Sequence, residues 1–208
     1  TPPFEPTERD GAIFGRGAAD TKSNIMALVG ALRAWDGRPP VGVKVFIEGQ
    51  EEVGGGALLD SGIHHVDLLL ALLGRPNSVS CYLRRVRDIF PAEDIALVTG
   101  EFAGGVLAEL VVGWSLRNVP GLLFRVCGTH GSLTAQRGSV EVAGEGVPGG
   151  QVLYRFEPTN GMREEIADFV ECAATGKRPL MGGPEARDDV AFVLAAYEAA
   201  RTGKQVTL

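Results

Sequence analysis

Residues 54–73 read GGGALLDSGIHHVDLLLALL, three glycines followed by a segment in which apolar residues return every three or four positions. This spacing places them on one wide face of a helix, which we predict over residues 58–73. Asp60, His64 and Asp67 interrupt the apolar pattern. Because Asp60 and His64 are four residues apart, they should lie one turn above each other on the same face. The segment therefore predicts a largely buried helix that carries a carboxylate and an imidazole together.

Downstream of this helix, apolar and polar residues alternate with a period of two, which is typical of strands. The segments with this pattern are each bounded by Gly, Pro or Asn and comprise residues 78–86, 94–102, 106–116, 122–128, 132–136, 139–143 and 152–156. Two helices are predicted to follow, over 161–175 and 184–202, and 204–208 is predicted as a final short strand. This order predicts an α+β domain in which helices pack on one face of a broad, mainly antiparallel sheet.

The first 53 residues predict a short β-α-β fragment of a different kind. The apolar residues after Asp20 recur at helical spacing, with Asp20 itself in the N-cap position. Residues 41–47 then alternate as a strand, and that strand leads to the adjacent carboxylates Glu51 and Glu52. The predicted fragment therefore carries its acidic residues near its turns.

These carboxylates have two interpretations. Carboxylate oxygens can bind a divalent ion, and a neighbouring Glu that is not a ligand can take a proton from the metal-bound water. Alternatively, Asp20, Glu51 and Glu52 are solvated acids at the ends of loops, and spacing alone favours this second interpretation.

The Asp60–His64 pair also has two interpretations. A carboxylate can orient an imidazole and keep it basic near neutral pH, which suits proton exchange with a substrate hydroxyl. Alternatively, His64 is a hydrogen-bonded residue on the buried face of a helix. The neighbouring His65 points elsewhere and is interpreted as structural.

Composition excludes several classes of protein. The 208 residues are 45% hydrophobic and carry a net charge of -6 from intermixed acids and bases, so a nucleic-acid-binding surface is not expected. No apolar run reaches the roughly 18 residues of a membrane span. No apolar leader follows a basic segment at the start either, so we predict a cytoplasmic protein with no membrane contact. Its three cysteines are widely spaced and are expected to be reduced.

The quoted helix, with VCGTHGSL at 126–133 and GGPEAR at 182–187, resembles the C-terminal domain of the glucose-fructose oxidoreductase / inositol dehydrogenase (Gfo/Idh/MocA) family. This resemblance implies that Asp60 and His64 are catalytic, with His64 helping to deprotonate a sugar or polyol hydroxyl. It implies that Asp67 holds the helix or binds a substrate hydroxyl. It also implies NAD or NADP as cofactor and a homo-oligomer as the assembly.

The N-terminal fragment resembles another family. Residues 3–6 (PFEP), 15–22 (GRGAADTK) and 48–54 (EGQEEVG) are similar to the zinc peptidases and deacylases that include acetylornithine deacetylase and succinyl-diaminopimelate desuccinylase. The resemblance implies that Asp20 bridges two zinc ions, Glu51 is the general base and Glu52 is a zinc ligand. The family's remaining ligands have no counterpart, so these roles are expected to be vestigial and zinc binding weak.

Neither glycine-rich motif predicts a dinucleotide site. The segment 15–20 (GRGAAD) ends in Asp where G-x-G-x-x-G requires Gly. The segment 144–149 (GEGVPG) links two predicted strands and opens no helix, so we interpret it as a hairpin loop. In the resembled family a separate N-terminal Rossmann domain holds the cofactor, and we expect that domain to be absent from a chain that begins at Thr1 by truncation.

We therefore predict two parts, a zinc peptidase-like fragment over 1–53 and an oxidoreductase C-terminal domain over 54–208 that binds substrate and dimerises. The domain is expected to be inactive alone. Two alternatives remain open, a remnant of a zinc-dependent amidohydrolase and a non-catalytic module that self-associates. Apolar residues of one strand, Leu107, Leu110 and Val112, are expected to form the exposed face through which two copies associate.

Overall fold

A computed structural model describes residues 5–15, 18, 24–40, 42–43, 55–88, 91–117, 122–157 and 161–208. The chain divides into two compact units, Thr1–Gly49 and Gln50–Leu208. Each unit is described by itself.

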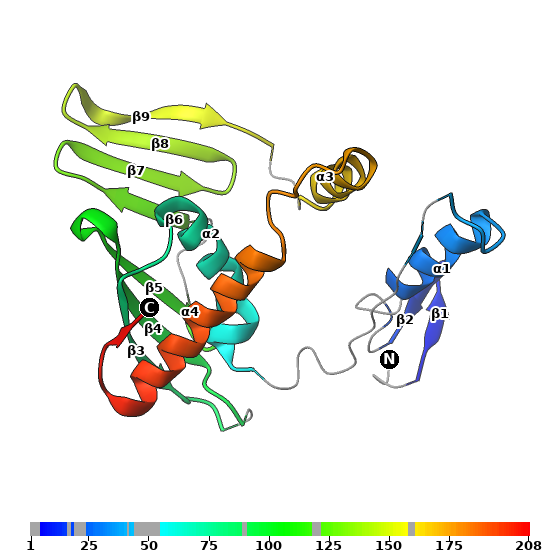
Figure 1. The fold of residues 1–208 in the computed structure, drawn as a ribbon, viewed down its shortest axis with the longest axis horizontal. Coiled ribbons are helices and arrows are strands. Elements are labelled where there is room, and N and C mark those ends of the chain that lie inside the picture. The colour runs from blue at the N-terminus through cyan, green and yellow to red at the C-terminus, as the bar shows by residue number, and fades with distance from the viewer. Residues whose placement is uncertain are drawn as a thin grey trace. The chain divides into compact units, whose positions relative to one another are not determined.

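The described residues of the first unit form a hairpin and the helix α1 (Asn24–Ala34) (Figure 1). Strands β1 (Thr7–Arg9) and β2 (Ala12–Phe14) pair antiparallel. Their two-residue turn, Asp10-Gly11, has φ angles of 53° and 73°, a backbone that Asp and Gly tolerate. Helix α1 (Asn24–Ala34) lies where a helix was predicted, although the expected N-cap Asp20 falls outside the described residues. The same is true of most of the predicted strand 41–47.

The second unit contains two antiparallel sheets of four strands each, where one broad sheet was expected (Figure 1). The first sheet has the order β10-β3-β4-β5, with β3 at Ser78–Arg84, β4 at Ile95–Glu101, β5 at Leu107–Gly113 and β10 at Val206–Thr207. The second has the order β6-β7-β8-β9, formed by Leu122–Cys127, Gly131–Gln136, Ser139–Gly144 and Val147–Arg155. Every predicted strand downstream of residue 54 is present, and the α+β class is confirmed.

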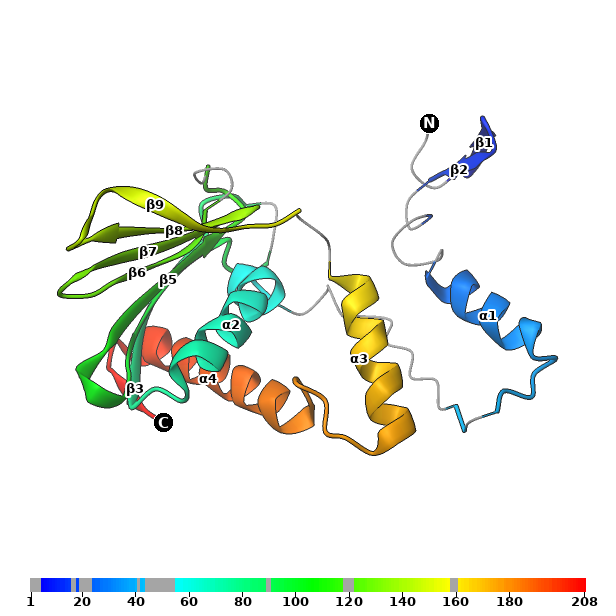
Figure 2. The same ribbon diagram turned by 90° about the horizontal axis from the view of Figure 1, so that it is seen from above.

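The predicted helix over 58–73 is also confirmed, with an irregular start. Residues Leu58–Gly62 are π-helical, and the helix continues as α2 (Ile63–Leu73). Two further helices follow the second sheet, α3 (Met162–Thr175) and α4 (Gly183–Thr202). Figure 2 shows α2 and α4 covering the same face of the sheet that contains β3, β4 and β5.

The hydrophobic core of this unit lies between that sheet face and the two helices. Its buried members come from every one of these elements: Leu58, Val66, Val79, Cys81, Ala96, Val98, Val112, Phe192, Val193, Ala195, Ala196 and Ala199. Burial of large side chains such as Phe192 contributes about 1.5–3 kcal/mol each to folding. This packing fixes the position of α2, and with it the positions of Asp60, His64 and Asp67.

The prediction that Leu107, Leu110 and Val112 form one exposed face is wrong, as the register of β5 shows. Val112 is a core residue and Leu110 packs against the core, while Leu107 and Val111 are the exposed apolar residues of this strand. The reason is the period of two, which puts residues 108, 110 and 112 on one face and 107, 109 and 111 on the other. Leu107 therefore does not share a face with Leu110 and Val112.

The segment 144–149 forms a hairpin between β8 and β9, as predicted. Gly144 pairs with Val147 across the turn at Glu145-Gly146, and β9 already begins at Val147. A Cβ on Gly144 would lie 2.3 Å from the carbonyl oxygen of His130, so the glycine permits a close backbone approach.

Candidate functional site

The start of the π-helical segment is anchored by Glu93, a residue of the β3–β4 loop. The backbone N–H of Ala57 donates to the Glu93 carbonyl oxygen at 3.0 Å, and that of Leu58 donates to Glu93 Oε1 at 3.2 Å. Tyr197 on α4 donates its hydroxyl to the same Oε1 at 2.9 Å. Glu93 thus satisfies backbone donors that the first turn of a helix leaves free.

Gly56 and Tyr197 both lie close to the Glu93 carboxylate. A Cβ on Gly56 would lie 1.9 Å from the Glu93 carboxyl carbon, so only glycine fits beside the carboxylate. Burial, reinforced by the hydrogen bond to Glu93, raises the pKa of the Tyr197 hydroxyl. The tyrosine therefore stays protonated and remains a donor at physiological pH.

Asp60 is held by a chain of two hydrogen bonds. The Ser61 hydroxyl donates to Asp60 Oδ2 at 2.8 Å and accepts from the indole N–H of Trp114 at 2.9 Å. Trp114 follows β5, so this chain ties the start of the helix to the sheet. Since Ser61 uses its only O–H on Asp60, the direction of both hydrogen bonds is fixed.

His64 lies one turn beyond Asp60 and is exposed to solvent. Within the described part of the chain, no hydrogen bond joins its imidazole to the Asp60 carboxylate, which is bound to Ser61 instead. The π-helical turn at Leu58–Gly62 explains this difference, because its wider winding offsets residues four apart from the alignment they have in an α-helix. His65 is exposed too, and its Nδ1 lies 3.3 Å from the Ser61 carbonyl oxygen.

The turn that carries Trp114 is itself organised by Asp94, which is fully buried. Its carboxylate accepts the backbone N–H groups of Val86 at 2.7 Å and Arg87 at 2.9 Å, together with the hydroxyl of Ser115. The hydrogen bond from Ser115 is the largest of the causes that lower the pKa of Asp94, and burial opposes them. The backbone N–H of Trp114 donates to the Asp94 carbonyl oxygen at 3.0 Å. Asp94 therefore fixes the position of Trp114, whose indole N–H donates to Ser61.

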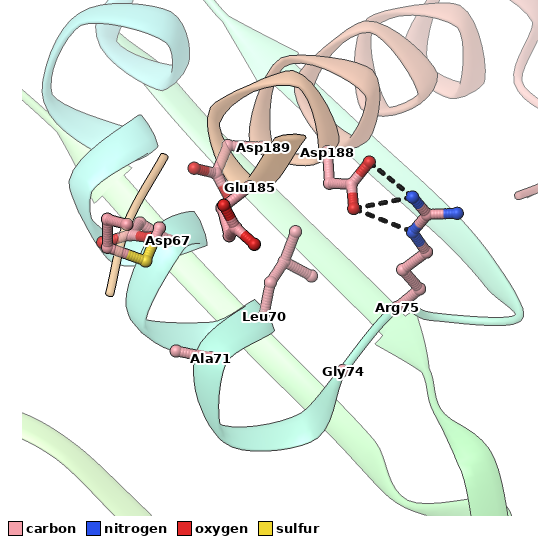
Figure 3. A pocket seen from close by; sticks show the side chains of 9 residues that line it. Asp67, Leu70, Ala71, Gly74, Arg75, Glu185, Asp188 and Asp189 are labelled. Carbon is pink, nitrogen blue, oxygen red and sulfur yellow. Dashed lines mark hydrogen bonds and ion pairs between the residues drawn. The ribbon is translucent and has the colours of Figure 1, made fainter. Parts of the chain in front are cut away.

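Asp67 lies apart from the other two predicted residues. It lines a cavity of about 150 Å³ between α2 and the start of α4, and neither Asp60 nor His64 lines it. Figure 3 shows Asp67 on α2, and Glu185 and Asp189 on α4, around this cavity. The structure therefore brings Asp60 and His64 to one end of the helix and places Asp67 in a separate cavity.

The predicted zinc residues Asp20, Glu51 and Glu52 lie outside the described residues. Among the residues that are described, no group of three or more His, Cys, Asp or Glu side chains could hold a metal ion. The glycine-rich segment 144–149 is a hairpin rather than a turn that opens a helix, so it does not fit a dinucleotide.

Sequence reasoning missed the residues that support the site from a distance. Glu93, Trp114 and Tyr197 reach the helix from a loop, a strand end and α4, and no local pattern marks them. Asp189 could have been found, because it occupies a core-facing position of α4, in helical register with Phe192, Val193 and Ala196.

A family model matches part of this chain. Residues 32–134 match the model of the GFO/IDH/MocA C-terminal domain, so the match begins upstream of the triglycine and includes α2. The curated relatives match a shorter stretch of the chain and are dipeptidases. A cysteinylglycine-S-conjugate dipeptidase of Corynebacterium striatum is 46% identical over 65 residues, and a human beta-Ala-His dipeptidase is 46% identical over 61 residues. Each match covers 28% of this chain and 14% or 12% of the relative.

Solved structures share the fold over most of the chain. An aldose-aldose oxidoreductase from Caulobacter crescentus, complexed with glycerol, is 26% identical with a TM-score of 0.65, over 81% of this chain and 52% of that one. An oxidoreductase from Agrobacterium radiobacter, solved with NAD+, L-tartaric acid and magnesium, is 22% identical with a TM-score of 0.61. That match covers 72% of this chain and 48% of the other, so the chain spans about half the length of these oxidoreductases.

In the described residues, no helix is both long and apolar enough to cross a membrane. The element order, the sheet with α2 and α4 on one face, the family match and the neighbouring structures agree with one another. The chain therefore has the α+β fold of the GFO/IDH/MocA C-terminal domain.

Proposed function

We propose that residues 54–208 form the substrate-binding and dimerisation domain of an NAD(P)-dependent oxidoreductase that acts on the CH–OH group of a sugar or polyol. The observation that carries this proposal is the hydrogen-bonded chain from Trp114 through Ser61 to Asp60, one turn away from a solvent-exposed His64. It holds a carboxylate in place about one helical turn from an accessible base, on a fold shared with oxidoreductases.

In this proposal His64 takes the proton of the substrate hydroxyl, and the fixed charge of Asp60 stabilises the imidazolium that results. The described residues contain no turn that fits a dinucleotide, so the cofactor would be held elsewhere. The part played by this chain is to position the substrate and accept the proton. The described domain alone is expected to be inactive, because hydride transfer needs the two reactants held about 3–3.5 Å apart.

Asp67 is proposed as a ligand-binding residue of the separate α2–α4 cavity, which does not include Asp60 or His64. Its Oδ1 atom is buried and has no hydrogen-bond partner within the described residues, so it is free to accept a hydrogen bond from a ligand.

Self-association is the second part of the proposal. Tyr82, Leu97 and Val111 are cross-strand neighbours on the face of the first sheet that α2 and α4 do not cover. Tyr82 is 66% exposed and Val111 46% exposed, and Leu107 at the end of the same face is 79% exposed. Contiguous apolar residues of this kind are typical of an interface. Light scattering should show a homo-oligomer that Val111→Lys dissociates, and a wild-type monomer at micromolar concentration would contradict this.

The short dipeptidase matches favour a second candidate for residues 1–53, the remnant of a zinc amidohydrolase with Asp20 and Glu52 as vestigial ligands and Glu51 as vestigial base. Calorimetry should find no tight zinc site, because carboxylates without histidines rarely select this ion. A stoichiometric zinc site that Glu52→Ala abolishes would favour the hydrolase.

The experiment that tests the main proposal compares two adjacent histidines. Ligand-observed NMR with a panel of sugars, polyols and hydroxy acids should detect binding to the wild-type chain and to His65→Ala, and weaker binding to His64→Ala. Absorbance assays with the same panel and NAD or NADP should stay flat. If no compound binds, or if both variants behave alike, the chain is instead a non-catalytic module that self-associates.

A further inference from the structure

The cavity between α2 and α4 is lined by four carboxylates, one from α2 and three from the first two turns of α4 (Figure 3). They are Asp67, Glu185, Asp188 and Asp189, and the remaining wall is largely apolar, with Leu70, Ala71 and Met181 among its members. Four carboxylates around a cavity of about 150 Å³ require positive charge nearby to compensate their negative charge.

Two of the four are compensated by arginines. Arg75 forms a bidentate pair with Asp188, with its Nη2 2.6 Å from Oδ1 and its Nε 2.9 Å from Oδ2. Arg178 pairs with Glu185, whose other oxygen accepts the backbone N–H of Gly182 at 3.0 Å. Glu185 also caps the start of α4 through its hydrogen bond with Gly182, so its carboxylate belongs to the structure of the helix.

Asp67 and Asp189 have no such compensation. Asp189 is only 6% exposed, and no hydrogen bond or ion pair to its carboxylate occurs within the described residues. Asp67 Oδ1 is buried and equally without a partner in that part of the chain. Burial, and then the charge of Asp67, raise the pKa of Asp189, so a cation beside the two carboxylates would be favourable.

Two unpaired carboxylates that line one cavity are stabilised by a bound cation, and the surroundings indicate the kind of cation. A metal ion is disfavoured, because the described carboxylates do not group into a metal site. An ammonium group has three N–H donors, enough for both free carboxylates, and the apolar wall suits an alkyl chain attached to it. A neutral hydroxyl would satisfy Asp67 Oδ1 but would leave the charge of Asp189 unpaired.

We propose that the α2–α4 cavity binds a primary alkylammonium group through the carboxylates of Asp67 and Asp189, with the alkyl chain against Leu70, Ala71 and Met181. The cavity excludes Asp60 and His64, so this site is separate from the proposed oxidoreductase site and does not depend on it.

Binding of n-butylammonium, with n-butanol as its neutral counterpart, tests the proposal on the full chain by protein-observed NMR. The ammonium should give saturable shifts at residues of α2 and the start of α4, and n-butanol should bind much more weakly. Asp189→Asn, which keeps the shape of the side chain, should weaken binding of the ammonium by about tenfold or more. Glu198→Gln makes the same change of charge on α4 outside the cavity, where Glu198 pairs with Arg201, and should leave binding unchanged.

Asp67→Asn provides a second variant if Asp189→Asn does not fold, and it should weaken the ammonium in the same way. Equal binding of n-butanol and n-butylammonium would show that the cavity is merely apolar, and would overturn the proposal. Unchanged binding in both aspartate variants, or the absence of saturable shifts in the wild-type chain, would overturn it as well.

Discussion

Replacing Gly56 with alanine should destabilise the second unit, because the glycine makes room for Glu93, which anchors the start of the helix at residues 58–73. The added Cβ would lie 1.9 Å from the carboxyl carbon and from Oε2 of Glu93, far inside contact distance. Alanine cannot remain there unless the Glu93 side chain moves away. The φ angle at Gly56 is not positive, so the backbone itself would accept alanine.

The expected loss of stability follows from the hydrogen bonds that the Glu93 carboxylate loses when it moves. Its carboxylate accepts two hydrogen bonds, from the Leu58 N–H at 3.2 Å and from the Tyr197 hydroxyl at 2.9 Å. A hydrogen bond to a charged group contributes about 1.5–3 kcal/mol, and both of these are only partly buried, so we take the lower end. The expected loss in the free energy of unfolding is then about 3 kcal/mol.

Urea denaturation of four proteins tests this reasoning: the wild type, Gly56→Ala, Glu93→Ala and the double variant. With Glu93 already truncated, Gly56→Ala should cost almost nothing, so the cycle should show a coupling of about 2–3 kcal/mol. Gly183→Ala, at the open start of α4 with no atom within 4 Å of the added Cβ, is the control and should be near neutral. Equal effects of Gly56→Ala in the presence and absence of Glu93 would refute the argument.

Further predictions concern ionisable groups. Because the folded pKa of Asp94 lies below its ordinary value of 3.8, its carboxylate stabilises the fold above that value and this contribution is lost as the pH falls through the folded pKa. Equilibrium unfolding should thus show stability rising with pH across this acidic range, with a shallower slope in Asp94→Asn; an unchanged slope would contradict the assignment. Burial raises the pKa of the Cys81 thiol to about 11, and Cys172 is also buried, whereas Cys127 is exposed. A thiol reagent at pH 8 should therefore modify one cysteine quickly, and Cys127→Ser should remove that fast phase; a fast phase that persists would place the reactive thiol elsewhere.

Much of the fold could be predicted because the relevant signals are local. A period of two marks the strands, a period near 3.6 marks residues 58–73 and 184–202, and glycine ends the helices α2, α3 and α4. Predicted strand ends differ from the observed ones by a few residues, except that β9 begins at Val147 rather than 152 because its hairpin turn is only two residues long. The division of the strands into two sheets depends on pairing between distant residues, which no local period encodes.

The features of the candidate site likewise divide into those that local sequence predicts and those that depend on tertiary packing. The segment GGGALLDSGIHH was sufficient to predict that Asp60 and His64 lie on one helical segment, since residue type and helical spacing are properties of the chain itself; their catalytic role stays a prediction. Packing against the sheet and α4 set the rest: Trp114 supports Ser61, Glu93 anchors the first turn, and Asp67 and Asp189 line one cavity. Hydrogen bonding and burial of this kind arise between segments that are 35 or more residues apart, as in the contact of Leu58 with Glu93, and exist only once the helices have docked on the sheet.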